Sequence, residues 1–156
     1  MKTVAIGCDP NAAPLKQIIK QHLNELGFEY QDYGSDDTVY ANVAIAVAEA
    51  VAGGKHERGI LLCGTGIGVS IAANKVPGAY AALCSDAYSA ERARKSNNAN
   101  IMTMGSQVIG SQLAKTLVTV WMGAEYTPGG RSEPKIRRIV EYDLARAGRG
   151  NESKPS

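Results

Sequence analysis

A thiol and a hydroxyl stand two positions apart in a glycine-rich segment with the sequence LLCGTGIGVS. Cys63 carries the thiol and Thr65 the hydroxyl, and three alternating glycines, Gly64, Gly66 and Gly68, surround them. Glycine lets the backbone turn sharply and approach a ligand closely, because it has no Cβ atom. These residue types at this spacing predict a turn that holds an anion and moves a proton.

The elements on either side of this turn are expected to position it. Residues 59–63 form a short apolar run between glycines, which predicts a strand buried on both faces of a parallel sheet. Residues 69–75 are predicted to be helical, so free N–H groups and the positive end of a helix dipole would face the turn. The pattern is not a dinucleotide fingerprint, because Val69 stands where the third glycine would fall.

The rest of the chain alternates between strand and helix patterns. The predicted strands cover residues 3–8, 28–33, 59–63, 79–84 and 101–104, and the predicted helices cover 14–26, 39–52, 69–75, 86–95, 111–122 and 134–147. This alternation predicts an α/β fold, a three-layer α/β/α sandwich around a Rossmann-like five-stranded parallel sheet. Ligands bind beyond the carboxyl ends of such strands, so Asp9, Cys63, Asp86 and residues 105–107 are expected to share one pocket.

Composition limits the class of protein. With 156 residues, 44% hydrophobic and 21% charged, the chain reads as one globular domain over residues 1–147, followed by a disordered tail over 148–156. No apolar run approaches the ~20 residues of a membrane span, and no signal peptide precedes the first strand, so a cytoplasmic protein is expected. The net charge of +2 argues against a nucleic-acid partner.

Three cysteines without paired spacing favour neither a disulfide framework nor a zinc ribbon. Cys8 and Cys84 end apolar runs and are interpreted as small buried hydrophobic residues. Cys63 differs from these two cysteines because it lies in the glycine-rich loop described above. The two histidines, His22 and His56, lie in polar surroundings and are expected at the surface.

Seven segments, in order along nearly the whole chain, resemble the ribose-5-phosphate isomerase B and galactose-6-phosphate isomerase family. They are IGCD at 6–9, VAEAVAGG at 47–54, LCGTGIG at 62–68, AANK at 72–75, NNAN at 97–100, MGS at 104–106 and GGR at 129–131. The resemblance implies interconversion of aldose and ketose sugar phosphates through an enediolate, as in the ribose 5-phosphate to ribulose 5-phosphate step of the pentose phosphate pathway. It implies neither a metal nor another cofactor.

The resemblance also implies roles for particular residues. Cys63 would be the base on carbon, Thr65 would assist proton movement on the sugar oxygens, and Asp9 would bind sugar hydroxyls. The implied substrate-binding residues are Gly64, Gly66, Ile67, Gly68, Ser70, Asn74, Asn97, Arg131 and Lys135, of which the last two match phosphate ligands. The family further implies a homodimer or tetramer with active sites shared between subunits, in which the basic C-terminal helix serves the partner's pocket.

Several family positions are changed in this chain. Pro10 and Ser96 stand where the family usually has histidines, and Gln107 stands where it has an arginine that binds phosphate. The changes fall on ring opening and phosphate binding, whereas the proton-transfer loop is intact. They predict weakened ribose 5-phosphate activity and favour an acyclic, shorter or differently phosphorylated sugar.

Two other functions stay open at the level of sequence. One is a non-catalytic sugar-phosphate binding paralogue or an inactive subunit of a heteromer, against which the intact Cys63 and Thr65 argue. The other is a thiol redox or cysteine-nucleophile enzyme, which the chain disfavours because it has no Cys-x-x-Cys pair and no histidine expected near Cys63. Tyr40 is interpreted as a packing residue.

Overall fold

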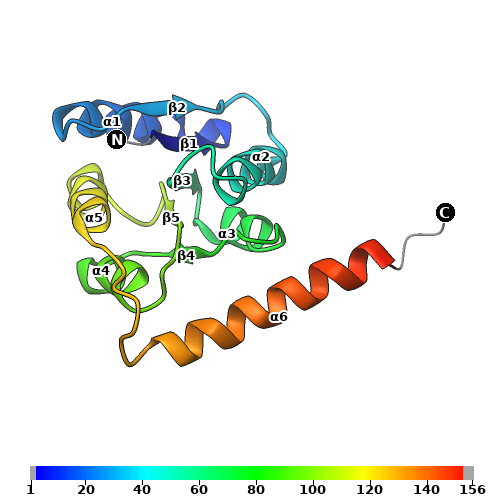
Figure 1. The fold of residues 1–156 in the computed structure, drawn as a ribbon. Helices are drawn as coiled ribbons and strands as arrows, with labels where there is room; N and C mark the ends of the chain where they lie inside the picture. The colour runs from blue at the N-terminus through cyan, green and yellow to red at the C-terminus, as the bar shows by residue number, and fades with distance from the viewer. Residues whose placement is uncertain (1–2, 153–156) are drawn as a thin grey trace.

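The sheet has five parallel strands, as the sequence predicts. The computed structural model describes residues 3–152, with side chains for residues 3–148. The strands are β1 (Val4–Cys8), β2 (Tyr30–Asp32), β3 (Arg58–Cys63), β4 (Ala81–Leu83) and β5 (Ile101–Gly105). They are ordered β2-β1-β3-β5-β4, and every neighbouring pair is parallel (Figure 1).

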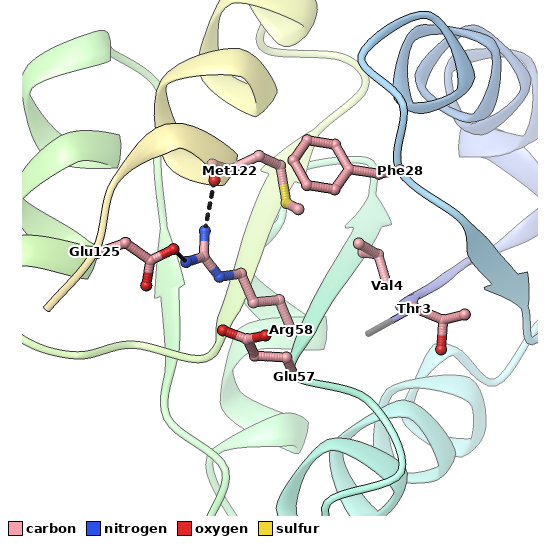
Figure 2. Close-up of a pocket in the computed structure, with 7 residues that line it drawn as sticks. All are labelled: Thr3, Val4, Phe28, Glu57, Arg58, Met122 and Glu125. Carbon is pink, nitrogen blue, oxygen red and sulfur yellow. Dashed lines mark hydrogen bonds and ion pairs between the residues drawn. The ribbon is translucent and has the colours of Figure 1, made fainter. Parts of the chain in front are cut away.

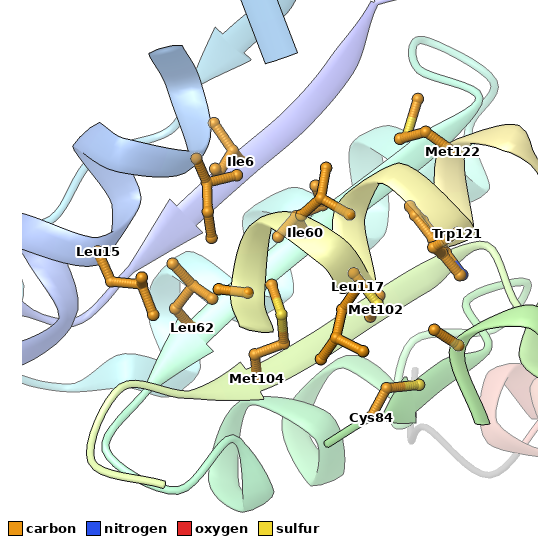
Figure 3. Close-up of a cluster of buried hydrophobic side chains, with 14 of the residues drawn as sticks. Ile6, Leu15, Ile60, Leu62, Cys84, Met102, Met104, Leu117, Trp121 and Met122 are labelled. Atoms are coloured by element: carbon orange, nitrogen blue, oxygen red, sulfur yellow. The ribbon is translucent and has the colours of Figure 1, made fainter. Parts of the chain in front are cut away.

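Helices cover both faces of the sheet and make three layers (Figure 1). One layer contains α1 (Ala13–Glu25), α4 (Ala87–Lys95) and α5 (Ser111–Gly123), and the other contains α2 (Tyr40–Ala52) and α3 (Ile67–Ala73). Because side chains alternate along a strand, β3 contributes Ile60 and Leu62 to the first core and Leu61 and Cys63 to the second. Figure 3 shows the first core, which includes Met102, Met104, Leu117 and Trp121.

Some elements differ from their predicted bounds. The chain before β4 is a turn, because Ala79 N donates to Val76 O and Tyr80 N donates to the Asn100 side chain. A short 3-10 helix, η1 (Pro10–Ala12), follows β1, and α3 begins at Ile67, two residues earlier than expected. Both of the last two differences lie at the carboxyl ends of β1 and β3.

The long helix α6 (Glu133–Glu152) lies beside the β4 edge of the sheet and extends past it (Figure 1). Asp143 anchors it, since its Oδ2 accepts from Gly78 N at 2.9 Å and from the Tyr80 hydroxyl at 2.8 Å. The helix runs through residues 148–152, where a tail was expected, and residues 153–156 lie outside the described part of the chain. None of the helices within residues 3–152 has the length and apolar character needed to cross a membrane.

The prediction that His56 lies at the surface is wrong. Its side chain is 2% exposed and lies 2.6 Å from Thr3 Oγ1 through Nδ1 and 2.7 Å from the Tyr33 hydroxyl through Nε2. The residues around His56 are polar in sequence. The turn nevertheless packs against Thr3 and Tyr33, and local polarity does not reveal these tertiary contacts. Cys8 and Cys84 are buried, as predicted.

Candidate active site at the carboxyl ends of β1 and β3

Cys63 is the last residue of β3, and its side chain is 5% exposed. Its Sγ atom accepts a hydrogen bond from Gly66 N at 3.1 Å. β1 and β3 are neighbours, and from them the chain continues toward opposite edges of the sheet, so their carboxyl ends form a topological switch point. Ligands of open α/β sheets bind at such points.

The loop after Cys63 is folded tightly against β5. Gly66 has a φ of +80°, and a Cβ atom there would lie 2.8 Å from the Met104 carbonyl carbon. The buried Thr103 hydroxyl donates to Gly66 O at 2.9 Å. A Cβ atom on Gly105 would similarly lie 2.6 Å from the Thr65 carbonyl oxygen. These contacts explain why glycine is needed at positions 66 and 105.

The first turn of α3 gives the loop its anion-binding character. The first four N–H groups of an α-helix have no intrahelical acceptor, and with Gly66 as the N-cap of α3 they belong to residues 66–69. Ile67 N donates to Thr65 Oγ1 at 3.2 Å. Because that hydroxyl accepts from the backbone, its own hydrogen can point to a ligand. The positive end of the helix dipole favours an anion in front of the loop.

Asp9 lies beside this loop, on the neighbouring strand end. Asp9 N donates to Leu62 O at 3.3 Å, and its side chain is largely buried. Its Oδ1 accepts from Ala12 N at 3.0 Å, which caps η1 and fixes the carboxylate at the edge of the sheet. Pro10 is the first residue of η1, so the residue that follows Asp9 helps to start this short helix.

Tyr40 was interpreted as a packing residue, and it packs on the loop itself. A Cβ atom at Gly68 would lie 2.3 Å from Tyr40 Cζ, so the phenol ring rests directly on Gly68. Gly68 therefore makes room for an aromatic ring. Nothing in the local sequence around either residue indicates this contact, which depends on how α2 packs on α3.

Asp86, expected in the same pocket, caps α4 by accepting from Ser89 N at 2.7 Å. It follows β4, which β5 separates from β3, so it lies two strands from Cys63. The hydrogen bonds from Ser89 lower the pKa of the Asp86 carboxyl. Gln107 does lie at the loop, since its backbone N donates to Gly64 O at 3.0 Å.

Four predicted binding residues are not brought to the Cys63 loop. Asn74 ends α3, where Nδ2 donates to Ala81 O at 3.0 Å and Oδ1 accepts from Ala81 N at 2.8 Å. Ala81 begins β4, so this amide lies at the amino edge of the sheet and closes the connection from α3 to β4. The structure therefore gives Asn74 a different position from the one that an anion-binding role within one copy requires.

Asn97, Arg131 and Lys135 are exposed. Asn97 lies in the turn before β5, at the amino edge, and lines a cavity of about 290 Å³ together with Ile136 of α6. Arg131 precedes α6 and Lys135 lies in its first turn. One copy of the chain thus presents the Cys63 loop at one edge of the sheet and Asn97 at the other.

A further cavity, of about 280 Å³, opens at the amino ends of β1 and β3 (Figure 2). Arg58 lines it and is 3% exposed. Its guanidinium donates to Trp121 O at 2.7 Å and to Met122 O at 3.1 Å, and so satisfies carbonyls at the end of α5. Because its donors are taken up by backbone carbonyls and by the Glu125 carboxylate, Arg58 has a structural role there. The cavity lies at the opposite edge from Cys63.

Comparison with known proteins identifies relatives over almost the whole chain. The family model described as Ribose/Galactose Isomerase matches residues 4–139. D-erythrulose-4-phosphate isomerase of Pectobacterium atrosepticum is 49% identical, with coverage of 92% of this chain and 96% of the relative. Ribose-5-phosphate isomerase B of Escherichia coli is 46% identical, with coverage of 94% and 99%. The solved structure of Clostridium thermocellum ribose-5-phosphate isomerase B superposes with a TM-score of 0.86 at 40% identity, covering 92% of this chain and 98% of that one.

Proposed function

The chain belongs to the ribose/galactose isomerase family, and from that premise we propose that it interconverts erythrose 4-phosphate and erythrulose 4-phosphate with Cys63 as the base. The family makes it an aldose-ketose isomerase. The particular sugar and the particular base are the parts that we add.

Cys63 is the basic group best placed for the reaction. Its thiolate would take the proton from C2 of the aldose, which leaves an enediolate. The thiol would exchange its proton with solvent and then donate a proton to C1 to give the ketose. The Thr65 hydroxyl would carry the proton that moves between O1 and O2. The amides of Gly68 and Val69, in the first turn of α3, would bind the enediolate oxygen. Loss of one such donor typically costs about 2.7–4 kcal/mol of transition-state stabilisation.

The replacement of the family's histidine by Ser96 is the main reason for proposing a four-carbon substrate. The family's ring-opening histidine is replaced by Ser96, whose hydroxyl accepts from Arg92 Nε at 2.7 Å within its own turn. Ribose 5-phosphate keeps a free hydroxyl on C4 and closes into a furanose. Erythrose 4-phosphate has its C4 oxygen esterified, so it cannot close that ring and needs no group to open it. The name of the Pectobacterium relative supports the same four-carbon substrate.

Shared active sites would complete the pocket. We propose that Asn97, Arg131 and Lys135 of one copy reach the Cys63 loop of a second copy in a homodimer or tetramer. Exposed apolar side chains beside the loop, Ile67 and Ile71, are available to such a contact. So are Ile139, Tyr142 and Leu144 of α6. The cytoplasmic location expected from the sequence stays a prediction.

The test is a comparison of kcat/KM for erythrose 4-phosphate, ribose 5-phosphate and allose 6-phosphate. Without a ring-opening group only the open-chain fraction of the longer aldoses reacts, so we expect a preference on the order of 100-fold for erythrose 4-phosphate. A preference for ribose 5-phosphate would contradict the proposed substrate. Binding of these sugars without any turnover would instead support the non-catalytic paralogue.

A further inference from the structure

Arg92, near the end of α4, reaches the turn that carries Asn97. Its Nε donates to Ser96 Oγ at 2.7 Å. Its backbone oxygen accepts from Ser96 N at 2.8 Å and from Asn97 N at 3.2 Å. These bonds fix the guanidinium group next to Ser96, the residue that stands in the sequence where the family usually has a histidine.

The charge of Arg92 has no carboxylate partner within the described residues. The other two cations in this last turn of α4 are paired, Arg94 with Glu125 at 3.7 Å and Lys95 with Glu91 at 3.4 Å. No ion pair of the described residues includes Arg92, and only its Nε takes part in a side-chain hydrogen bond. The two Nη groups are therefore available as a planar fork, the geometry that binds phosphate oxygens in pairs.

The proposed site lacks one cation that the family has for phosphate binding, and Arg92 could take over its role. Gln107, beside Gly64, is neutral where the family has its phosphate-binding arginine. In the proposed dimer the Asn97 turn of one copy faces the Cys63 loop of the other. Because Arg92 is bonded to this turn, it would lie at the same pocket as Asn97. Resting on the proposed function, we infer that the Nη groups of Arg92 bind the phosphate of the substrate in the neighbouring copy's site.

The inference predicts a phosphate-specific defect. Arg92→Gln is expected to raise KM for erythrose 4-phosphate about 10-fold or more, because one charge-assisted contact is lost, with kcat nearly unchanged. The slow reaction of unphosphorylated erythrose should not change. Arg92→Lys should recover part of the affinity, and Lys95→Gln, on the same helix, is the matched control that should leave KM unchanged. An equal loss with both sugars, or an unchanged KM, would overturn the assignment.

Binding measured without turnover separates this inference from the proposed reaction. In the Cys63→Ala background, titration calorimetry with inorganic phosphate should give a Kd about 10-fold higher for Arg92→Gln than for the parent protein. An unchanged Kd would overturn the role of Arg92 even in an active enzyme. A dependence on Arg92 in a protein that isomerises no sugar phosphate would contradict the proposed reaction and leave the phosphate site in place.

Discussion

The Sγ atom of Cys63 lies 3.1 Å from the backbone nitrogen of Gly66, which donates a hydrogen bond to it. This contact joins the proposed base to the turn that leads into α3, so the loop's backbone geometry and the state of the thiol are coupled. Gly66 holds this position in the left-handed region of backbone space, with its carbonyl fixed by Thr103. The predictions below follow from this arrangement and from the two edges of the sheet.

Substitution of Gly66 should damage both stability and activity. In Gly66→Ala the new Cβ atom would meet the Met104 carbonyl carbon at 2.8 Å in a backbone conformation that costs about 1–2 kcal/mol for other residues. We expect a loss of about 2–4 kcal/mol in unfolding free energy and at least 10-fold in kcat. Urea unfolding and steady-state kinetics measure both. Gly27→Ala, with φ of +86° and no atom within 4 Å, tests backbone strain alone and should leave kcat unchanged.

Acid should remove the stabilisation that Asp32 provides. Partial burial by itself would raise the pKa of Asp32, but hydrogen bonds from Lys16, Lys20 and Gly34 N outweigh it and lower the pKa from 3.8 to about 2. A carboxyl with a lowered pKa stabilises the fold above pH 3.8 and loses that effect as the pH falls toward 2. The shift corresponds to about 2 kcal/mol. Urea unfolding of the protein and of Asp32→Asn should differ by that amount at pH 6 and converge near pH 2, and a constant difference would contradict the ion-pair account.

Alkylation should distinguish Cys63 from the other two thiols. Burial raises the pKa of Cys8 and of Cys84 to about 11, which keeps both protonated at neutral pH. Iodoacetamide at pH 7.5 should therefore modify Cys63 first, since only the thiolate reacts. Peptide mass spectrometry reads the site, and erythrose 4-phosphate should slow the reaction. Faster modification of Cys8 or Cys84, or no protection by the sugar, would argue against Cys63 as the residue that meets the substrate.

Two inactive variants should restore activity when combined. If active sites are shared, a mixed dimer of Cys63→Ala and Arg131→Gln chains contains one site with both changes and one with neither. Such a dimer, isolated by two different affinity tags, should show about half of the wild-type kcat per dimer. Each variant alone supplies the control. A mixed dimer without activity would place Arg131 and Cys63 of one copy in the same site.

The sequence predicted the layers, the strand number and the loop because each depends on local patterns. The apolar run of β3 and the glycines after it indicate a buried strand and a ligand-facing turn without any tertiary information. The hydrogen bonds between the Asn74 side chain and Ala81 could not be found in this way, because they depend on how the end of α3 meets the start of β4. The burial of His56 and the contact of Tyr40 with Gly68 likewise arise from packing between distant segments.

The bond between Arg92 and Ser96 is different, because Ser96 directly follows the predicted helix over residues 86–95 and lies four residues after Arg92. An arginine that precedes a serine by four residues faces the same side of the helix, so the contact could have been predicted. What the sequence could not show is that Arg94 pairs with the distant Glu125 and that Arg92 has no acidic partner in the described structure.

The most direct test of the central claim is proton NMR of the reaction of erythrose 4-phosphate in D2O. If Cys63 moves the proton through an enediolate, the substrate should convert to erythrulose 4-phosphate with deuterium at the transferred position. The Cys63→Ala protein should show neither conversion nor exchange, while keeping its fold and its affinity for the sugar phosphate. Conversion and exchange that persist in Cys63→Ala would contradict the assignment of Cys63 as the base.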